Sequence, residues 1–143
     1  MEEGTMISVT KRGLRSVSVA AGVLALAGVA APAQAEGSFN SSIGSWLAGS
    51  NESRRWTDRN TDATSTSVAF GGCSTDPGSF YSVSPAVYKD VFGPDQNKGT
   101  KTNYCGTSSW GDLASGDYYF RLELINGGAT GYRFSATAVT VRY

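Results

Sequence analysis

The sequence predicts an all-β protein, a single small antiparallel β-sandwich of Greek-key or immunoglobulin-like type, with one disulfide and one short helical turn. Apolar and polar residues alternate with period two near the C-terminus, as on a strand with one buried face. The chain contains 18 Gly, 7 Tyr and 6 Phe, which favours turns and strands. Its 143 residues allow one domain. We expect about six to eight strands, as in other sandwiches of this size.

The first 35 residues are typical of a cleaved secretory signal peptide. A basic region precedes an apolar run over residues 17–29, and a small-x-small sequence follows, so we expect cleavage after Ala35. The apolar run is shorter than the roughly 20 residues of a membrane-spanning helix, so no membrane association is expected after cleavage. Translation could start at Met1 or at Met6, since Glu2 and Glu3 are unusual before a basic region. The basic residues are Lys11, Arg12 and Arg15.

Residues 36–55 are rich in Ser, Gly and Asn, yet they carry four large apolar side chains. The glycines and serines disfavour a helix. The segment is therefore the first strand of the sandwich, an extended arm that pairs with another protein by strand addition, or a disordered stretch. In the second interpretation the partner-binding residues are Phe39, Ile43, Trp46 and Leu47. The β-sandwich domain proper is expected over residues 56–143.

Three short strands are predicted in the middle of the chain. Residues 64–70 alternate Thr, Val and Phe with small polar residues and end at a Gly pair. Residues 80–83 and 100–105 are rich in aromatic, β-branched or Thr residues, which suits strands.

Residues 84–94 carry the signals of a short helical turn. Ser84 and Pro85 resemble a cap and a first helical residue, while Gly93 and Pro94 resemble a helix end. The apolar residues between them share one helical face. Residues 95–99 are then expected to form a polar turn.

The C-terminal third predicts a hairpin. Residues 118–125 alternate as a strand, a Gly-rich loop follows, and residues 132–143 return with a change of parity that indicates a bulge near Ala138. The stretch from Leu113 to Tyr118 resembles the tyrosine corner of Greek-key sandwiches, in which the hydroxyl bonds backwards to the chain.

Cys73 and Cys105 are the only cysteines. Because an exported chain meets oxidising conditions and offers no imidazole nearby, the pair is expected to form a disulfide rather than a metal site.

The composition argues against most catalytic and nucleic-acid-binding functions. The absence of His excludes a Ser-His-Asp triad, a Cys-His dyad and imidazole metal sites within this chain. A formal charge of zero is untypical of nucleic-acid binders. Asp58 begins half of a calcium loop, but Ala63 and Ala69 stand where an EF-hand needs Gly and Glu, which leaves only a looser oxygen site or a solvated turn. No spacing marks a pair of glycosidase carboxylates.

These exclusions favour a secreted, non-catalytic binding or adaptor module whose partner is another secreted or cell-surface protein, with no cofactor and no metal. The Ala-rich signal and the Thr, Gly and Ser bias resemble those of small exported proteins of Gram-positive bacteria, which include accessory subunits of toxin assemblies. One alternative is a lectin-like protein in which Trp110, or Trp46, stacks on a glycan. Another is an inhibitor of a secreted hydrolase that acts through residues 95–102.

Overall fold

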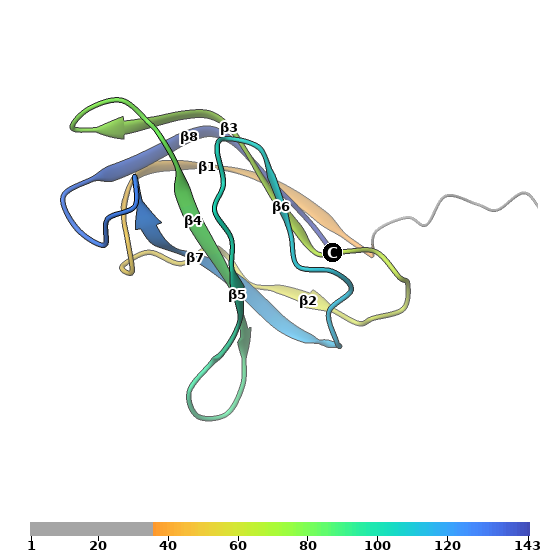
Figure 1. Ribbon diagram of the computed structural model, residues 1–143. Coiled ribbons are helices and arrows are strands. Elements are labelled where there is room, and N and C mark those ends of the chain that lie inside the picture. Colours follow the sequence, from red (N-terminus) through yellow and green to blue (C-terminus); the bar gives the residue numbers. More distant parts are fainter. Residues whose placement is uncertain (1–35) are drawn as a thin grey trace, which may run out of the picture. The chain divides into compact units, whose positions relative to one another are not determined.

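The computed structural model describes residues 36–143, which form eight strands in two packed four-stranded antiparallel sheets (Figure 1). Sheet A has the order β1-β8-β3-β6, and sheet B has the order β2-β7-β4-β5. The described residues contain no helix. The strands are β1 (Ser38–Leu47), β2 (Trp56–Asp58), β3 (Ser67–Asp76), β4 (Val83–Asp90), β5 (Gln96–Thr100), β6 (Thr107–Ser109), β7 (Gly116–Ile125) and β8 (Arg133–Arg142).

The strand pairing is that of a long hairpin rolled up on itself. β1 pairs with β8, β2 with β7, β3 with β6 and β4 with β5, so the two numbers of each pair sum to nine. Rolling then brings β3 against β8 and β4 against β7. This order is that of a jelly roll, a double Greek key, and it differs from the immunoglobulin order, in which the first two strands are neighbours.

The predicted C-terminal hairpin is wrong, although both of its strands exist. β7 lies in sheet B and β8 in sheet A, so the Gly-rich loop between them crosses from one sheet to the other. Alternation records which face of a strand is buried, but it does not record which strand lies beside it.

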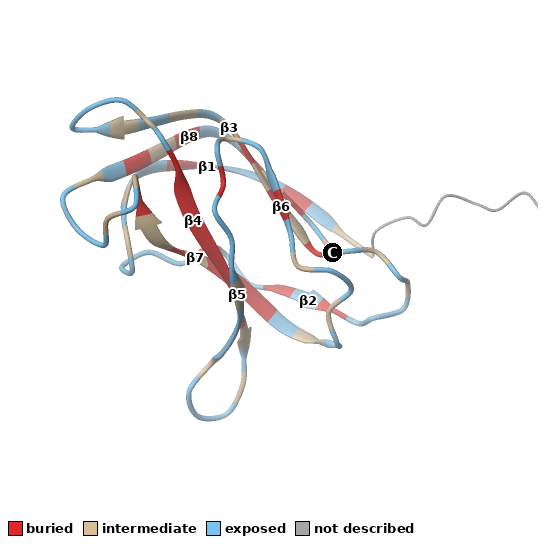
Figure 2. Ribbon diagram, viewed as in Figure 1, coloured by how far each residue is buried: buried red, intermediate tan, exposed pale blue. Residues whose placement is uncertain are grey.

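The core lies between the sheets and is built from the inward face of every long strand (Figure 2). Phe70 contacts Phe120 and Phe134 edge-on, with ring centroids 5.9 and 5.6 Å apart. The contact with Phe120 of β7 joins sheet A to sheet B, whereas the contact with Phe134 of β8 lies within sheet A. The buried apolar residues of this cluster are Phe39, Ile43, Trp56, Val68, Phe70, Val83, Val87, Tyr118, Phe120, Leu122, Ile125, Phe134, Ala136, Val139 and Val141.

The helical turn expected over residues 84–94 is wrong, because most of this segment is strand β4. Val83–Tyr88 is buried on both faces, so its apolar residues form a continuous run that also fits a helical face (Figure 2). Pro85 mimics a helix start, but it lies where the register against β7 shifts, a place where a strand tolerates the missing N–H. The polar turn expected at residues 95–99 is largely strand β5, and the strand expected at 80–83 begins only at Val83.

Residues 36–55 contain a strand of the sandwich and not a separate arm. β1 pairs with β8 along its length, and Phe39 and Ile43 are buried in the core. Both side chains are part of the sandwich core. If β1 left the sandwich to pair with a partner, it would expose them to water.

Two local expectations are confirmed. The Tyr118 hydroxyl donates to the carbonyl oxygen of Ala114, which closes the tyrosine corner at the start of β7. In β8 the register against β1 shifts by one residue between Val139 and Ala136, which is the bulge expected near Ala138. Gly72, at φ +60°, sits against Thr137 of the bulge, where an added Cβ would lie 1.9 Å from its Oγ1.

The disulfide is also confirmed. Cys73 of β3 bonds to Cys105 in the connection between β5 and β6, with Cα atoms 5.9 Å apart. Since β5 belongs to sheet B and β6 to sheet A, the bond ties the crossing connection to sheet A.

Changing Tyr118 to Phe removes the hydroxyl that donates to Ala114 and keeps the buried ring. We expect the free energy of unfolding to fall by about 1 kcal/mol, the usual net value of one such bond. Urea denaturation measures it, and Tyr132→Phe serves as a control because the Tyr132 hydroxyl has no hydrogen-bond partner among the described residues. Equal midpoints for Tyr118→Phe and the natural protein would contradict a stabilising corner.

Replacing Cys73 and Cys105 together with Ser removes a cross-link between residues 32 positions apart. We expect the free energy of unfolding to fall by roughly 3 to 4 kcal/mol, because the unfolded chain regains the freedom of that loop. Urea midpoints of the oxidised protein and the double variant give the difference. An unchanged midpoint would show that the sheets alone hold the connection.

Candidate functional site

The most exposed large apolar side chain lies in the turn between β4 and β5. This turn, residues 91–94, is called the tip; it projects beyond the two sheets in Figure 1. Phe92 is fully exposed there, whereas the other large apolar residues with substantial exposure lie elsewhere. Those others are Leu47 (39%), Tyr81 (71%) and Tyr104 (67%). Single exposed apolar side chains are common on protein surfaces, but this one lies on a projecting turn, and binding residues are concentrated on such connections, so the tip is a candidate contact element.

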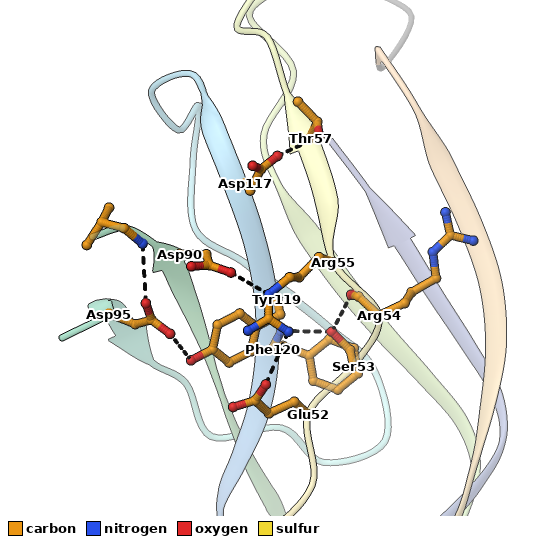
Figure 3. Close-up of polar contacts among 11 residues, drawn as sticks. Glu52, Ser53, Arg54, Arg55, Thr57, Asp90, Asp95, Asp117, Tyr119 and Phe120 are labelled. Atoms are coloured by element: carbon orange, nitrogen blue, oxygen red, sulfur yellow. Dashed lines mark hydrogen bonds and ion pairs between the residues drawn. The ribbon is translucent and has the colours of Figure 1, made fainter. Parts of the chain in front are cut away.

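The base of the tip is held on both sides by charged groups. The Asp95 carboxylate accepts from the amide of Val91 at 3.2 Å and from the hydroxyl of Tyr119 at 2.7 Å (Figure 3). On the other side, the Arg55 guanidinium forms an ion pair with Asp90. The turn is therefore anchored to β7 and to the chain before β2. These contacts of Asp90 and Asp95 are together called the clamp.

Beneath these contacts, two arginines and two tyrosines form a continuous stack on the outer face of sheet B. The rings of Tyr88 and Tyr119 lie 5.4 Å apart and nearly parallel, at 12°. Arg55 covers Tyr119 at 4.5 Å, and Arg121 covers Tyr88 at 4.6 Å. The arginines bury both rings on what would otherwise be a solvent face, and the planar guanidinium gains a cation–π contact.

Hydrogen bonds and an ion pair hold the end of the stack formed by Tyr88 and Arg121. Tyr88 donates to Glu123 at 2.6 Å and accepts from Arg121 at 2.8 Å, while Arg121 also pairs with Glu123 at 2.9 Å. Desolvation, followed by the bond to Glu123, raises the pKa of Tyr88. The tyrosine therefore remains a neutral donor at physiological pH.

Residues 52–55, called the linking segment, continue the edge of sheet B beyond β2. The Ser53 amide donates to the Phe120 carbonyl, and the Phe120 amide donates to the Ser53 hydroxyl, both at 2.9 Å (Figure 3). Because side chains alternate along an extended segment, Arg54 and Arg55 leave it in different directions. Figure 3 shows Arg54 reaching toward β1 and Arg55 reaching toward Asp90.

A cleft opens between β1 and the linking segment. Its floor is apolar and includes Phe39, Ile43 and Phe120, and its rim carries Ser41 and Arg54. Three of the four residues predicted to bind a partner, Phe39, Ile43 and Trp46, line this cleft, while Leu47 does not. These three residues belong to strand β1 of the sandwich, and their role in binding a partner stays a prediction.

The aromatic residues proposed to stack on glycans are already engaged by the protein. The Trp110 indole N–H donates to the Gly99 carbonyl at 2.7 Å, and Gly99 lies against its ring. Trp110 and Trp46 are half-buried against the core, and Trp56 is buried within it. The exposed rings of Tyr81 and Tyr104 meet at 87°, so they do not form one flat platform.

The acidic residues near Asp58 serve the local turn. Asp58 accepts from the amide of Asn60 at 2.8 Å, Asp62 from that of Thr64 at 2.7 Å, and Glu36 from that of Arg59 at 2.7 Å. Desolvation, and then the neighbouring carboxylates, raise the pKa of Asp58. Within residues 36–143 no group of three or more acidic or cysteine side chains is placed to hold a metal ion.

No family model, no curated protein and no solved structure matches this chain. In the described part of the chain, no helix reaches the length and hydrophobicity that crossing a membrane requires.

Sequence reasoning missed the tip. The helical interpretation of residues 84–94 puts Val91 and Phe92 on an apolar helical face. The inhibitor alternative expects the exposed loop at residues 95–102, a range that overlaps strand β5. The usable signal is the Gly93-Pro94 dipeptide, which marks a turn as well as a helix end and so places Phe92 beside a turn.

Protonating Asp95 should release the tip. The bonds from Tyr119 and then from the Val91 amide lower the pKa of Asp95 below its ordinary value of 3.8. The carboxylate's contribution is therefore complete above pH 3.8 and is lost as the pH falls through the lower folded value. We expect the Val91 amide resonance to titrate below pH 3.8 in ¹⁵N NMR spectra and to lose this titration in Asp95→Asn. A Val91 amide that titrates at or above pH 3.8 would contradict the clamp.

Proposed function

We propose that this protein is a secreted, non-catalytic binding module that inserts Phe92 into an apolar pocket of a protein partner. The observation that carries the proposal is the fully exposed Phe92 at the apex of a clamped turn. Export is supported by the predicted signal peptide and by the disulfide.

The chemistry of the tip favours a concave protein surface. A large aromatic side chain that fills a desolvated pocket is the usual source of binding energy in an interface. Val91 and Gly93 flank Phe92, and Pro94 follows, so the apex itself carries no charge that would have to be desolvated.

The clamp reduces the cost of binding. The contacts of Asp90 and Asp95 order the turn before any partner arrives, so less conformational entropy is lost on association. A rigid convex tip also discriminates by shape, because a partner must offer a pocket of matching depth.

The same geometry argues against the two alternatives. A glycan platform needs an open, flat aromatic face, whereas Trp110 is tied to Gly99 and the exposed tyrosines are perpendicular. An inhibitor that binds like a substrate needs a free extended loop, whereas most of the segment expected for it, residues 95–102, is strand β5, which pairs with β4.

Photo-crosslinking from the tip tests the proposal. We expect p-benzoylphenylalanine in place of Phe92 to form a saturable adduct with one protein in the producing organism's culture supernatant. The captured protein, purified separately, should bind the natural chain with 1:1 stoichiometry in titration calorimetry. Phe92→Ala should weaken binding by about 30-fold or more, the effect of an anchor worth about 2 kcal/mol.

Tyr104→Ala is the matched control, because it removes an exposed aromatic side chain outside the tip. Urea denaturation should give Phe92→Ala the stability of the natural protein, since the ring contacts no core. Equal affinity of the natural and Phe92→Ala proteins for the captured partner would overturn the proposal. A loss of the same size in Tyr104→Ala would also do so.

A further inference from the structure

The cleft between β1 and the linking segment combines an apolar interior with two charged side chains in its lining, Arg54 and Glu52. The Glu52 carboxylate pairs with Arg55 at 3.3 Å, so among the described residues Arg54 is the lining charge without an ion pair. Phe39, Ile43, Val139 and Phe120 supply the interior, and Trp46 packs against Phe120 with centroids 5.9 Å apart. The space amounts to about 410 Å³, part of which is open solvent.

Small side chains leave the cleft open: Ser41, Ser42 and Ser53 all line it. Phe39, Ser41 and Ile43 occupy alternate positions of β1, and Phe39 and Ile43 are buried core residues. Ser41 stands between them and remains exposed at the rim. A larger residue at position 41 would close the space.

Arg54 provides the positive charge. Its guanidinium lies over the Phe39 ring, 4.4 Å from the centroid. Within residues 36–143 it takes part in no ion pair, whereas Arg55 and Arg121 both pair with carboxylates. A guanidinium held on an apolar wall without an anion is set to receive one, and a carboxylate matches its fork of donors.

Strand addition is a poor fit to this edge. The register of β1 shifts twice, between Ser41 and Ile43 and between Ile43 and Trp46, and Ser45 has φ +53°. Such irregularities interrupt the regular row of backbone groups that an added strand needs. The cleft is therefore better suited to a compact ligand than to a long peptide.

We propose that the cleft binds a small amphipathic monocarboxylate, with its apolar group between β1 and Phe120 and its carboxylate on Arg54. The charge complementarity of Arg54 selects an anion, and the apolar floor selects a hydrocarbon tail. This site is separate from the tip, so it can be present whether or not Phe92 has a partner.

Octanoate, octanol and octylamine test the proposal, because they share a hydrocarbon tail and differ in the head group. We expect octanoate to shift the Ile43 methyl and Phe120 ring resonances saturably in NMR titrations of the purified protein. Octanoate should bind about tenfold more tightly than octanol, since a charge-assisted bond contributes on the order of 1.5 kcal/mol or more, and octylamine should bind most weakly.

Two variants test separately the charge of Arg54 and the free space inside the cleft. Arg54→Gln should remove the preference for octanoate over octanol, while Arg59→Gln, which changes an arginine that does not line the cleft, should keep it. Ser41→Phe should abolish the shifts by filling the cleft. If this variant fails to fold, the Arg54→Gln comparison still decides the question.

Four results would overturn the proposal. One is the absence of saturable shifts at Ile43 and Phe120. Another is equal binding of octanoate and octylamine. The third is an equal loss of preference in Arg54→Gln and Arg59→Gln. A dimer in sedimentation equilibrium that covers the cleft would also overturn it, because a second copy would then be the occupant.

Discussion

The pairing of the linking segment with β7 is the interaction on which the rest of the structure depends. β7 carries aromatic rings on both faces: Phe120 points into the core, and Tyr119 points outward. A solvent-facing strand with a buried ring needs a cover. The reciprocal bonds between Ser53 and Phe120 hold the linking segment beside β7, and Arg55 then supplies that cover.

This pairing also connects the two proposed sites. Arg55 stacks on Tyr119 and pairs with Asp90 at the base of the tip. Arg54, the residue before it, lies over Phe39 at the mouth of the cleft. The linking segment thus holds the tip through Arg55 and contributes Arg54 to the cleft. The two side chains can do so because neighbouring side chains of an extended chain point in opposite directions.

Local patterns in the sequence predicted local features well. Alternation located β7, the Leu113–Tyr118 stretch gave the tyrosine corner, a change of parity gave the bulge of β8, and cysteine counting gave the disulfide. Long-range pairing could not be predicted in this way, because alternation is the same for a hairpin and for a sheet-crossing loop.

The errors in the candidate site have the same origin. Because β4 is buried on both faces, its sequence shows no alternation of apolar and polar residues. The signals around Pro85 then favour a helix, and a helix over residues 84–94 leaves no place for the tip. Phe39, Ile43 and Trp46, which the sequence predicts as partner-binding residues, line the cleft, whereas its charged side chains come from the linking segment, beyond β1 in the sequence. Native-state hydrogen exchange at Ser53 and Phe120 tests the central pairing most directly. The account predicts that these amides exchange as slowly as those joining β4 to β7, whereas exchange as fast as in the loop after β7 would contradict it.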